Sequence, residues 1–467
     1  NKALGWSLLL NKQSDNQYCL LIIKSHCFVL FIIRFHLVPA MIERCEIFCD
    51  SKITIIPHRV DNKTLSQKVA LKKNEMDDQE PFFVVNLTTL LEKFVEFMRE
   101  LPNVKIFYAV KCNDDPVILT LLAKLGCGFD CASEGEISKI LNPEITTPEN
   151  IIFANPCKTK KSIKLAGATG INMMTFDNLE ELSRIKKLHE NPEMILRIDV
   201  TDPTAMCPLG NKFGCDAEKV APKLLQEANK MGIRVTGISF HVGSGCNQPE
   251  IFDTAICYSR NLFDIGKKLG HPMKILDIGG GFPGADTKKV SFAKIAAVIR
   301  SSIHRHFSNY EELTVIAEPG RFMVCSPISA VVNVISDVRV PASRITKNEL
   351  DSSKAGFMYF VNQGVFGPFN CRVFDNYFPT GEPLFPASTK DEETFDSLIW
   401  GPTCDSIDKI EECKKMRHLQ EGDWLYYPNM GAYTATTSST FNGFERPKSF
   451  YFVDELSWEI MQRPIDT

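Results

Sequence analysis

The sequence predicts a closed barrel of eight parallel strands with crossover helices, joined to a second, all-β domain, a β-sandwich or barrel built mainly from the carboxyl-terminal part. From about residue 105, short apolar runs alternate with longer segments of helical period, such as Leu179–His189, which is the pattern of repeated strand–helix units. Eight parallel strands with crossovers close into a barrel whose chemistry lies at the carboxyl ends of the strands. The expected strands are Lys105–Val110, Gly128–Ala132, Ile151–Ala154, Met173–Phe176, Met194–Val200, Val235–His241, Lys274–Ile278 and Thr314–Ala317.

The pattern changes after Arg321 to strand-like runs punctuated by Pro and Gly, with few helical periods. These runs predict a β domain in the carboxyl-terminal part of the chain. A further strand-like run at Lys52–Ile56 is expected to join it. We therefore expect residues 41–80 to add strands to the β domain, residues 81–325 to form the barrel, and residues 326–467 to form most of the β domain.

Residues 1–40 differ from the rest of the sequence. The chain begins with Asn1 and runs through an apolar stretch before its first methionine, Met41. Lys24 and Arg34 interrupt that stretch, so its uncharged runs fall well short of the roughly 20 residues of a membrane span. We expect residues 1–40 to be an upstream extension or unstructured, with a signal anchor as the alternative.

The composition favours a cytoplasmic enzyme that acts on a small molecule. A net charge of −4 over 467 residues gives no basic field for nucleic acid, and no membrane partner is expected. The 16 cysteines form no C-x-x-C pair, and Cys127 and Cys131 have the wrong spacing for a zinc site. Reduced thiols and no bound metal are therefore expected.

Lys111 follows the first predicted strand and is a candidate nucleophile. Burial at an apolar strand end lowers the pKa of an ammonium group and frees the amine to condense with an aldehyde. The alternative is a lysine that lies at the barrel rim with its amine in water. The segments that follow other strands favour the first interpretation.

Two of those segments suit a phosphate group. The glycines at Gly279–Gly281 let backbone N–H groups approach a phosphate closely, and Arg321 adds a guanidinium that fits phosphate oxygens. Glu318 lies three residues earlier and can partner a pyridine nitrogen. A glycine turn and a surface Glu–Arg pair are the alternative interpretations.

His241 and Cys404 are the remaining candidates. His241 ends the sixth predicted strand, where its flat ring can lie against a flat cofactor while Ser244 reaches the phosphate; the alternative is a core histidine. Cys404 precedes Asp405, whose negative charge keeps a thiol protonated and suits a proton donor. The alternative for Cys404 is a small buried apolar residue. An amine, phosphate ligands and an acid are the groups that pyridoxal phosphate requires.

The ordered motifs resemble those of a known family. They run from about Pro81 to Trp458 as FYAVKCND, GFDCAS, MMTFDN, LRI, KFG, SFHVGSGC, LDIGGGFPG, AEPGRF, VNQGVFGPFNC, WGPTCDSID and NMGAYT. In this order they are similar to the fold-type III pyridoxal-phosphate decarboxylases, and among these to the eukaryotic ornithine decarboxylase family. The resemblance implies decarboxylation of L-ornithine to putrescine and carbon dioxide, the first step of polyamine biosynthesis.

The resemblance also implies a role for each matching residue. Lys111 would hold the cofactor, His241 would stack on its ring, Glu318 would partner the pyridine nitrogen, and Cys404 would protonate the substrate carbon from the partner subunit of a homodimer. The implied cofactor-binding residues are Lys111, Asp130, Arg197, His241, Ser244, Gly280, Gly281, Glu318, Pro319, Gly320, Arg321 and Tyr433. The implied substrate-binding residues are Phe374, Asp375, Asp405 and Phe441, and the implied intersubunit ion pair is Lys212–Asp408.

Three alternatives or departures remain open at the level of sequence. Gln363 and Phe366 stand where the family usually has aspartate and tyrosine, so a hydroxyl contact is lost at the second position. A catalytically inactive relative that binds antizyme would be expected to have lost several site residues, and lysine or arginine could replace ornithine as substrate. The segment Asn155–Lys187, with Lys158, Lys160, Lys161 and Lys164, resembles an antizyme-binding element; its alternative is a solvated basic helix face.

Overall fold

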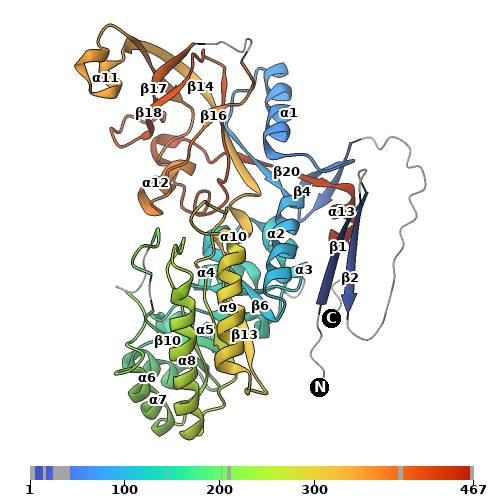
Figure 1. Cartoon of the computed structure of the whole chain (residues 1–467), viewed down its shortest axis with the longest axis vertical. Helices are drawn as coiled ribbons and strands as arrows, with labels where there is room; N and C mark the ends of the chain where they lie inside the picture. Colours follow the sequence, from blue (N-terminus) through green and yellow to red (C-terminus); the bar gives the residue numbers. More distant parts are fainter. Residues whose placement is uncertain are drawn as a thin grey trace.

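The computed structural model describes residues 6–13, 17–24, 43–142, 145–200, 202–207, 212–387 and 393–462. Figure 1 shows the barrel in the lower part of the molecule and a large sheet in the upper part, with α2 and α10 near the boundary between them. Over this described part of the chain, no helix is long and apolar enough to cross a membrane.

The barrel closes as predicted, in the order β10-β11-β12-β13-β6-β7-β8-β9, with all neighbouring strands parallel. Each predicted barrel strand overlaps one observed strand, because each apolar run is buried between the barrel interior and the surrounding helices. The strands are β6 Val104–Ala109, β7 Gly128–Cys131, β8 Ile151–Phe153, β9 Met173–Phe176, β10 Glu193–Ile198, β11 Arg234–Phe240, β12 Ile275–Asp277 and β13 Thr314–Ala317.

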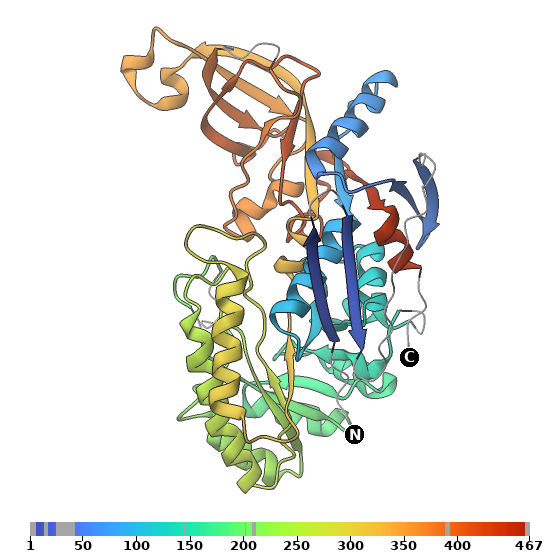
Figure 2. The same cartoon turned by 45° about the vertical axis from the view of Figure 1, so that its right-hand side comes forward.

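Helices alternate with these strands and cover the barrel, with α8 and α9 side by side on one flank (Figures 1 and 2). Local signals fix where they begin. Asp115 caps α3 by accepting hydrogen bonds from the N–H groups of Val117 and Ile118, and Pro116 occupies the first helical position, where no N–H is needed. The barrel helices are α2 Leu87–Glu100, α3 Pro116–Lys124, α4 Glu134–Ile140, α5 Lys160–Thr169, α6 Leu179–Leu188, α7 Ala221–Lys230, α8 Glu250–Lys268, α9 Phe292–Phe307 and α10 Arg321–Val324.

The second domain is built on a mixed sheet in the order β18-β17-β15-β14-β5-β20-β4-β3, with β19 pairing to β14 and β16 to β19. Its strands are β3 Arg44–Phe48, β4 Ser51–Ile56, β5 Phe82–Asn86, β14 Ile328–Pro341, β15 Ala355–Val361, β16 Glu382–Pro383, β17 Thr394–Trp400, β18 Lys409–Arg417, β19 Trp424–Tyr427 and β20 Lys448–Asp454. Its helices are α1 Asn62–Glu75, α11 Ser343–Thr346, α12 Cys371–Phe374 and α13 Glu455–Met461. The amino-terminal strands β3 and β4 thus pair with strands from the other end of the chain.

Two features of this sheet differ from the expectations. β5 falls within the range assigned to the barrel, yet it pairs with β14 and β20, because its five apolar and amide side chains are all buried and need cover on both faces. Helix α1 was not foreseen, since its apolar residues are few. The proposed boundaries between the domains remain predictions.

Two strands lie within residues 1–40. β1 Trp6–Gln13 and β2 Gln17–Lys24 pair antiparallel as a small separate sheet. The expectation that residues 1–40 are unstructured therefore does not hold for these two strands, and the rest of that segment lies outside the described residues. Whether it is an upstream extension stays a prediction.

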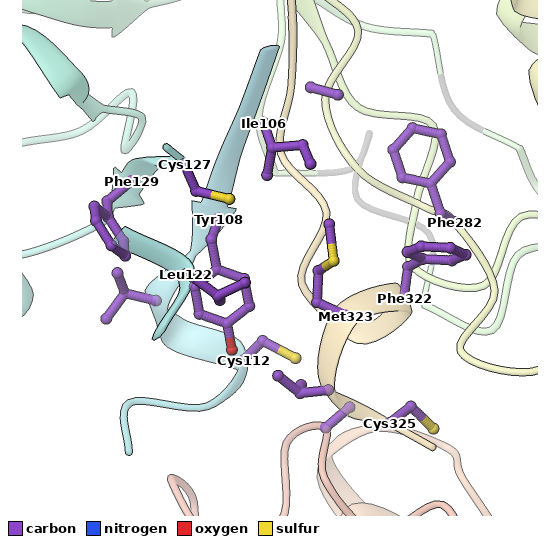
Figure 3. Packing of buried hydrophobic residues seen from close by; sticks show 14 of the residues in the cluster. Ile106, Tyr108, Cys112, Leu122, Cys127, Phe129, Phe282, Phe322, Met323 and Cys325 are labelled. Carbon is purple, nitrogen blue, oxygen red and sulfur yellow. The ribbon is translucent and has the colours of Figure 1, made fainter. Parts of the chain in front are cut away.

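A cluster of phenylalanines anchors α10, which begins at Arg321. The ring of Phe322 lies 4.2 Å from Phe292 and 5.8 Å from Phe97, between their centroids, and both partners are fully buried on α9 and α2. Figure 3 shows Phe322 and Met323 of α10 in the same buried cluster as Ile106 and Tyr108 of β6. This packing holds the backbone of Arg321 rigidly beside the end of the first barrel strand.

The carboxyl ends of the barrel strands face the second domain. The N–H of Tyr433 donates to the carbonyl of Cys112, and the side-chain amide of Asn113 donates to the carbonyl of Gly431. The Tyr451 hydroxyl of β20 donates to Asp115 at 2.7 Å. Segments from both domains therefore meet around the residues that follow β6.

Candidate active site

Lys111 lies directly after β6, in a short 3-10 turn, and contacts the end of the next strand. Its Nζ is 2.5 Å from Oδ2 of Asp130, which is completely buried in β7. Burial lowers the pKa of Lys111, but the negative charges of Asp130 and its neighbours outweigh burial and raise the pKa above its ordinary value. The expectation of a lowered lysine pKa was wrong, because the carboxylate next to the amine stabilises the charged form.

His241 follows β11 and is held in one tautomer. Its Nδ1 accepts a hydrogen bond from the N–H of Gly243 at 3.0 Å, so any ring proton of the neutral form sits on Nε2. Burial, together with the positive charges of Arg197 and Lys111, lowers the pKa of His241 well below its ordinary value. The imidazole ring is therefore neutral, and its flat face can stack against a flat cofactor ring.

Glu318 follows β13 and shares its site with a second carboxyl group, Asp277 of β12, which the sequence analysis did not single out. Both side chains are almost fully buried, and Asp277 also accepts a hydrogen bond from the N–H of Gly279 at 2.9 Å. Burial raises the pKa of Glu318 well above its ordinary value, and the charges of Asp277 and Asp130 raise it further. Two close carboxyl groups in such a site retain a proton. The signal for Asp277 was its place at the carboxyl end of a predicted strand.

Arg321 joins two of the predicted site residues. Its guanidinium donates to Oγ of Ser244 from Nη2 at 2.8 Å and from Nε at 3.2 Å. Nη2 also donates to Oδ1 of Asp375 at 2.6 Å, and the Tyr433 ring lies 5.2 Å from the guanidinium carbon. The structure thus brings together Ser244, Arg321 and Tyr433, and it adds Asp375, which the resemblance placed at the substrate.

The glycines after β12 form a tight backbone surface beside this cluster. Gly281 has φ +105°, and a Cβ there would lie 2.6 Å from the carbonyl oxygen of Gly243. A Cβ on Gly280 would lie 2.9 Å from Nε2 of His241. Only glycine fits at these positions, and the backbone stays open to a phosphate or a flat ring.

The donors and acceptors of this region fit pyridoxal phosphate. Among the described residues, buried oxygens without a hydrogen-bond partner include Oδ1 of Asp130, Oε1 of Glu318 and Oδ2 of Asp375. Buried carboxyl oxygens of this kind need donors, and the protonated ring nitrogen of the cofactor is a donor that fits Glu318, while the aldehyde suits the Lys111 amine and the phosphate suits the Arg321 guanidinium. Lys111, Glu318 and Arg321 stand at the matching places. No cluster of metal ligands exists in the described parts of the chain.

Several predicted residues lie apart from this cluster. Cys404 and Asp405 are exposed, and Phe374 has 69% of its surface exposed. Phe441 stacks on Phe366 with 4.3 Å between ring centroids, so Phe366 makes an aromatic contact despite the missing hydroxyl. Within this single chain, no described contact joins Cys404 or Asp405 to Lys111.

Gln363, the other departure, is buried, and its side-chain amide donates to the carbonyl of Glu445 at 2.7 Å. The side chain therefore has a structural role in holding the segment that follows Phe441. A neutral amide satisfies this contact, whereas an aspartate would need a different partner.

The predicted ion pair between Lys212 and Asp408 does not form within the chain. Asp408 is 1% exposed and accepts hydrogen bonds from the N–H of Val365 at 2.6 Å and from the N–H and hydroxyl of Thr403 at 2.9 and 2.6 Å. Lys212 is exposed and lies over the ring of Phe213. A pairing across a dimer stays a prediction.

A parallel barrel with a lysine amine at one strand end and an arginine–serine pair beside a glycine turn fits the class of enzymes that use pyridoxal phosphate. Comparison with known families agrees: the sequence matches the pyridoxal binding domain of the pyridoxal-dependent decarboxylases over residues 87–325 and their C-terminal sheet domain over residues 251–431. The chain belongs to the pyridoxal-dependent decarboxylase family, and its cofactor is pyridoxal phosphate.

The most similar curated relatives include ornithine decarboxylases. That of Panagrellus redivivus is 50% identical over 91% of this chain and 98% of its own length, and that of Caenorhabditis elegans is 48% identical over 90% and 98%. An antizyme inhibitor 2 of Xenopus laevis is 41% identical over 86% of this chain and 87% of its own.

Solved structures give the same fold. The arginine decarboxylase of Paramecium bursaria Chlorella virus, bound to agmatine, is 33% identical with a TM-score of 0.76, over 83% of this chain and 100% of the other. A lysine/ornithine decarboxylase of Vibrio vulnificus in complex with putrescine is 27% identical with a TM-score of 0.72, over 84% and 99%. The predicted barrel and second domain are confirmed as the fold of this class.

Proposed function

We propose that this protein decarboxylates L-ornithine to putrescine and carbon dioxide, the first step of polyamine biosynthesis. The observation that carries the proposal is the Lys111–Asp130 pair at the barrel strand ends, beside the Arg321–Ser244 pair and the buried Glu318. Curated relatives at 40–50% identity named ornithine decarboxylase support the choice of substrate.

Each residue of the cluster has a task that follows from its contacts. Pyridoxal phosphate, when bound, supplies an aldehyde for amines and a ring that accepts the electron pair left by carbon dioxide. Lys111 must lose its proton before it can attack the aldehyde, and Asp130 Oδ2 at 2.5 Å holds the amine in place while favouring its charged form. Glu318 retains a proton in its buried site and can donate it to the ring nitrogen. Arg321 and Ser244 bind and orient the phosphate.

The substrate is recognised by its distal ammonium group. Asp375 and Asp405 are the proposed partners, since a buried cation needs compensating charge. Asp375 contacts Arg321 through Oδ1, and its buried Oδ2, which has no hydrogen-bond partner among the described residues, would be the oxygen that accepts from the ammonium group. Phe374 and Phe441 would form the apolar walls of the same pocket.

The site is completed by a second subunit. Cys404 and Asp405 are exposed on this chain, and they would enter the active site of the partner in a homodimer, where Cys404 returns a proton to the substrate carbon. Exposed apolar side chains that surround this region support a protein interface: Val373, Phe374, Phe378 and Ile407.

Mixing two inactive variants tests this shared arrangement. Lys111→Ala and Cys404→Ala should each be nearly inactive alone. After mixing and exchange of subunits, half of the dimers would be mixed and each would carry one intact site, so about one quarter of the wild-type activity should return. No recovery in a mixture shown to contain mixed dimers would contradict the proposal.

The substrate assignment is tested by carbon dioxide release. Purified protein with pyridoxal phosphate is offered ornithine, lysine and arginine separately. Ornithine-selective release is expected; release mainly from lysine or arginine would keep the mechanism and overturn the substrate.

A second candidate function is antizyme binding without catalysis, and the similarity to an antizyme inhibitor favours it. The exposed side chains of Lys160, Lys161 and Lys164 support a binding surface on α5. Lys158 does not belong to that surface: it is fully buried and pairs with Glu181, so its assignment to a basic face was wrong. A folded protein that binds pyridoxal phosphate but releases no carbon dioxide would favour this candidate.

We also place the protein in the cytoplasm. The 14 cysteines of the described residues are all free, and several of them are buried, which is typical of proteins that fold in a reducing compartment.

A further inference from the structure

Asp202 lies in the segment Asp202–Cys207 after β10 and is fully buried, although no role in the mechanism accounts for it. Its Oδ1 accepts hydrogen bonds from the N–H and the hydroxyl of Thr204, both at 2.7 Å. Its Oδ2 accepts hydrogen bonds from the N–H groups of Asn247 and Gln248, at 2.8 and 3.1 Å. One carboxylate therefore satisfies donors from two separate loops.

The second of these loops, residues 242–248, carries Ser244. The two segments are joined further by paired backbone hydrogen bonds: the N–H of Cys207 donates to the carbonyl of Ser244, and the N–H of Ser244 to that of Cys207, each at 3.1 Å. The N–H of Asp202 also donates to the carbonyl of Val242 at 2.8 Å. The segment Asp202–Cys207 thus lies along this loop, with an isolated antiparallel β-bridge between Cys207 and Ser244.

The charge state of Asp202 suits this task. Burial alone would raise its pKa, but the hydrogen bonds from Thr204 and Asn247 outweigh burial and lower the pKa below the ordinary value. Asp202 therefore remains a carboxylate, the only form that accepts all these hydrogen bonds without placing a proton against a donor.

We propose that Asp202 is a positioning residue that fixes the loop of residues 242–248 and so places Ser244 Oγ to bind the cofactor phosphate with Arg321. Ser244 Oγ already accepts two hydrogen bonds from the Arg321 guanidinium. Without the carboxylate, the N–H groups of Asn247 and Gln248 lose their acceptor, and only the backbone hydrogen bonds and the Asn247 and Gln248 side chains still join the loop to the segment after β10. This inference rests on the proposed function, because it takes Ser244 as a phosphate ligand.

Asp202→Asn tests the proposal with almost no change in shape. In either orientation of the amide, its NH2 group faces at least one backbone N–H, either that of Thr204 or those of Asn247 and Gln248. The affinity for pyridoxal phosphate should fall about tenfold, as expected for a buried donor left without an acceptor. Pyridoxal, which lacks the phosphate, should bind with unchanged affinity.

Binding is measured by the absorbance of the cofactor as it is titrated into the cofactor-free protein. Two further variants are measured in the same way. Thr204→Val removes one of the four hydrogen bonds to Asp202, together with the one that the Gln248 side chain donates to Thr204, and should cost about threefold in pyridoxal phosphate affinity alone. Asp216→Asn is the matched control, since the exposed Asp216 accepts hydrogen bonds only from the neighbouring N–H groups of Glu218 and Lys219. It should leave both affinities unchanged.

The outcomes separate cleanly. Equal losses for pyridoxal and pyridoxal phosphate in Thr204→Val and Asp202→Asn would mean a general effect on the fold and would overturn the inference, as would unchanged binding in both. Wild-type protein that binds neither compound would instead overturn the proposed function, on which the inference rests.

Discussion

At the scale of single residues, the site consists of opposite charges that already pair within the chain. Lys111, whose side chain is 40% exposed, contacts the buried Asp130, and the buried Arg321 contacts the buried Asp375. Such pairs avoid the cost of an isolated buried charge. These pairs also affect cofactor binding, because Lys111 and Arg321 must exchange contacts with the two carboxylates for contacts with the cofactor.

The first prediction concerns Asp130→Asn. Removal of the carboxylate should lower the pKa of Lys111, so the unprotonated amine becomes available at lower pH. The midpoint of the pH dependence of pyridoxal phosphate attachment, followed by absorbance, should therefore move toward acid. Asp264→Asn, which breaks the pair with Arg260 on α8, is the control. An unchanged midpoint in Asp130→Asn would contradict the assigned role.

The second prediction concerns Asp277, whose pKa burial raises to about 7 in the folded cofactor-free protein. The folded state then binds more protons than the unfolded state between about pH 4 and 7. The free energy of unfolding should consequently fall as pH rises through this window, by on the order of 1.4 kcal/mol per unit of pKa shift.

Asp277→Asn removes this titrating group. Urea denaturation of the variant at several pH values should give a flatter dependence over the same window, since the neutral amide can still accept the hydrogen bond from Gly279. A slope equal to that of the wild type would show that other groups control the pH dependence.

At the scale of elements, the site depends on how each strand ends. β11, β12 and β13 end in the segments that carry His241, the glycine turn and Glu318, and their parallel pairing brings these segments to one edge. The sequence placed these ends well, because a short apolar run bounded by glycine or charge leaves little freedom in where the strand stops. It could not place Asp277 against Glu318, since that contact arises from strand pairing.

The third prediction compares two glycines with positive φ. Gly281→Ala should abolish most pyridoxal phosphate binding, because the added Cβ would lie 2.6 Å from the Gly243 carbonyl and 2.7 Å from the Val242 side chain. Gly270→Ala has a similar backbone strain at φ +86° but open space around the added atom. It should cost about 1 kcal/mol of stability and leave binding intact. Equal loss of binding in both variants would assign the effect to strain rather than to the turn.

At the scale of the whole molecule, the two domains meet at the residues that follow Lys111. Cys112, Asn113 and Asp115 each contact the second domain through a hydrogen bond. The lysine backbone is therefore fixed from both sides, by its own strand and by the sheet domain. A change in the hydrogen bonds between the domains should therefore change the affinity of the site for the cofactor.

The fourth prediction tests this contact with Tyr451→Phe. Loss of the hydrogen bond to Asp115 should lower the free energy of unfolding by about 1 kcal/mol, measured by urea denaturation, and should weaken pyridoxal phosphate binding. Tyr310→Phe removes a hydrogen bond to Met273 within the barrel and serves as the control. Tyr310→Phe should lower the free energy of unfolding similarly and leave cofactor affinity unchanged. Weakened binding in both variants would show that the hydrogen bond between the domains has no particular effect on cofactor binding.

The sequence by itself determined the barrel and its eight strands and pointed to the candidate cofactor residues, because strand ends and short motifs are local signals. Only the tertiary structure decided the contacts between distant segments. It placed β5 in the sheet, paired Arg321 with Asp375, buried Lys158 and Asp408, and joined Asp202 to the loop of Ser244. Each of these contacts joins residues that are far apart in the sequence. Which residue pairs with a buried charge or an open strand edge therefore depends on the folded arrangement of the whole chain.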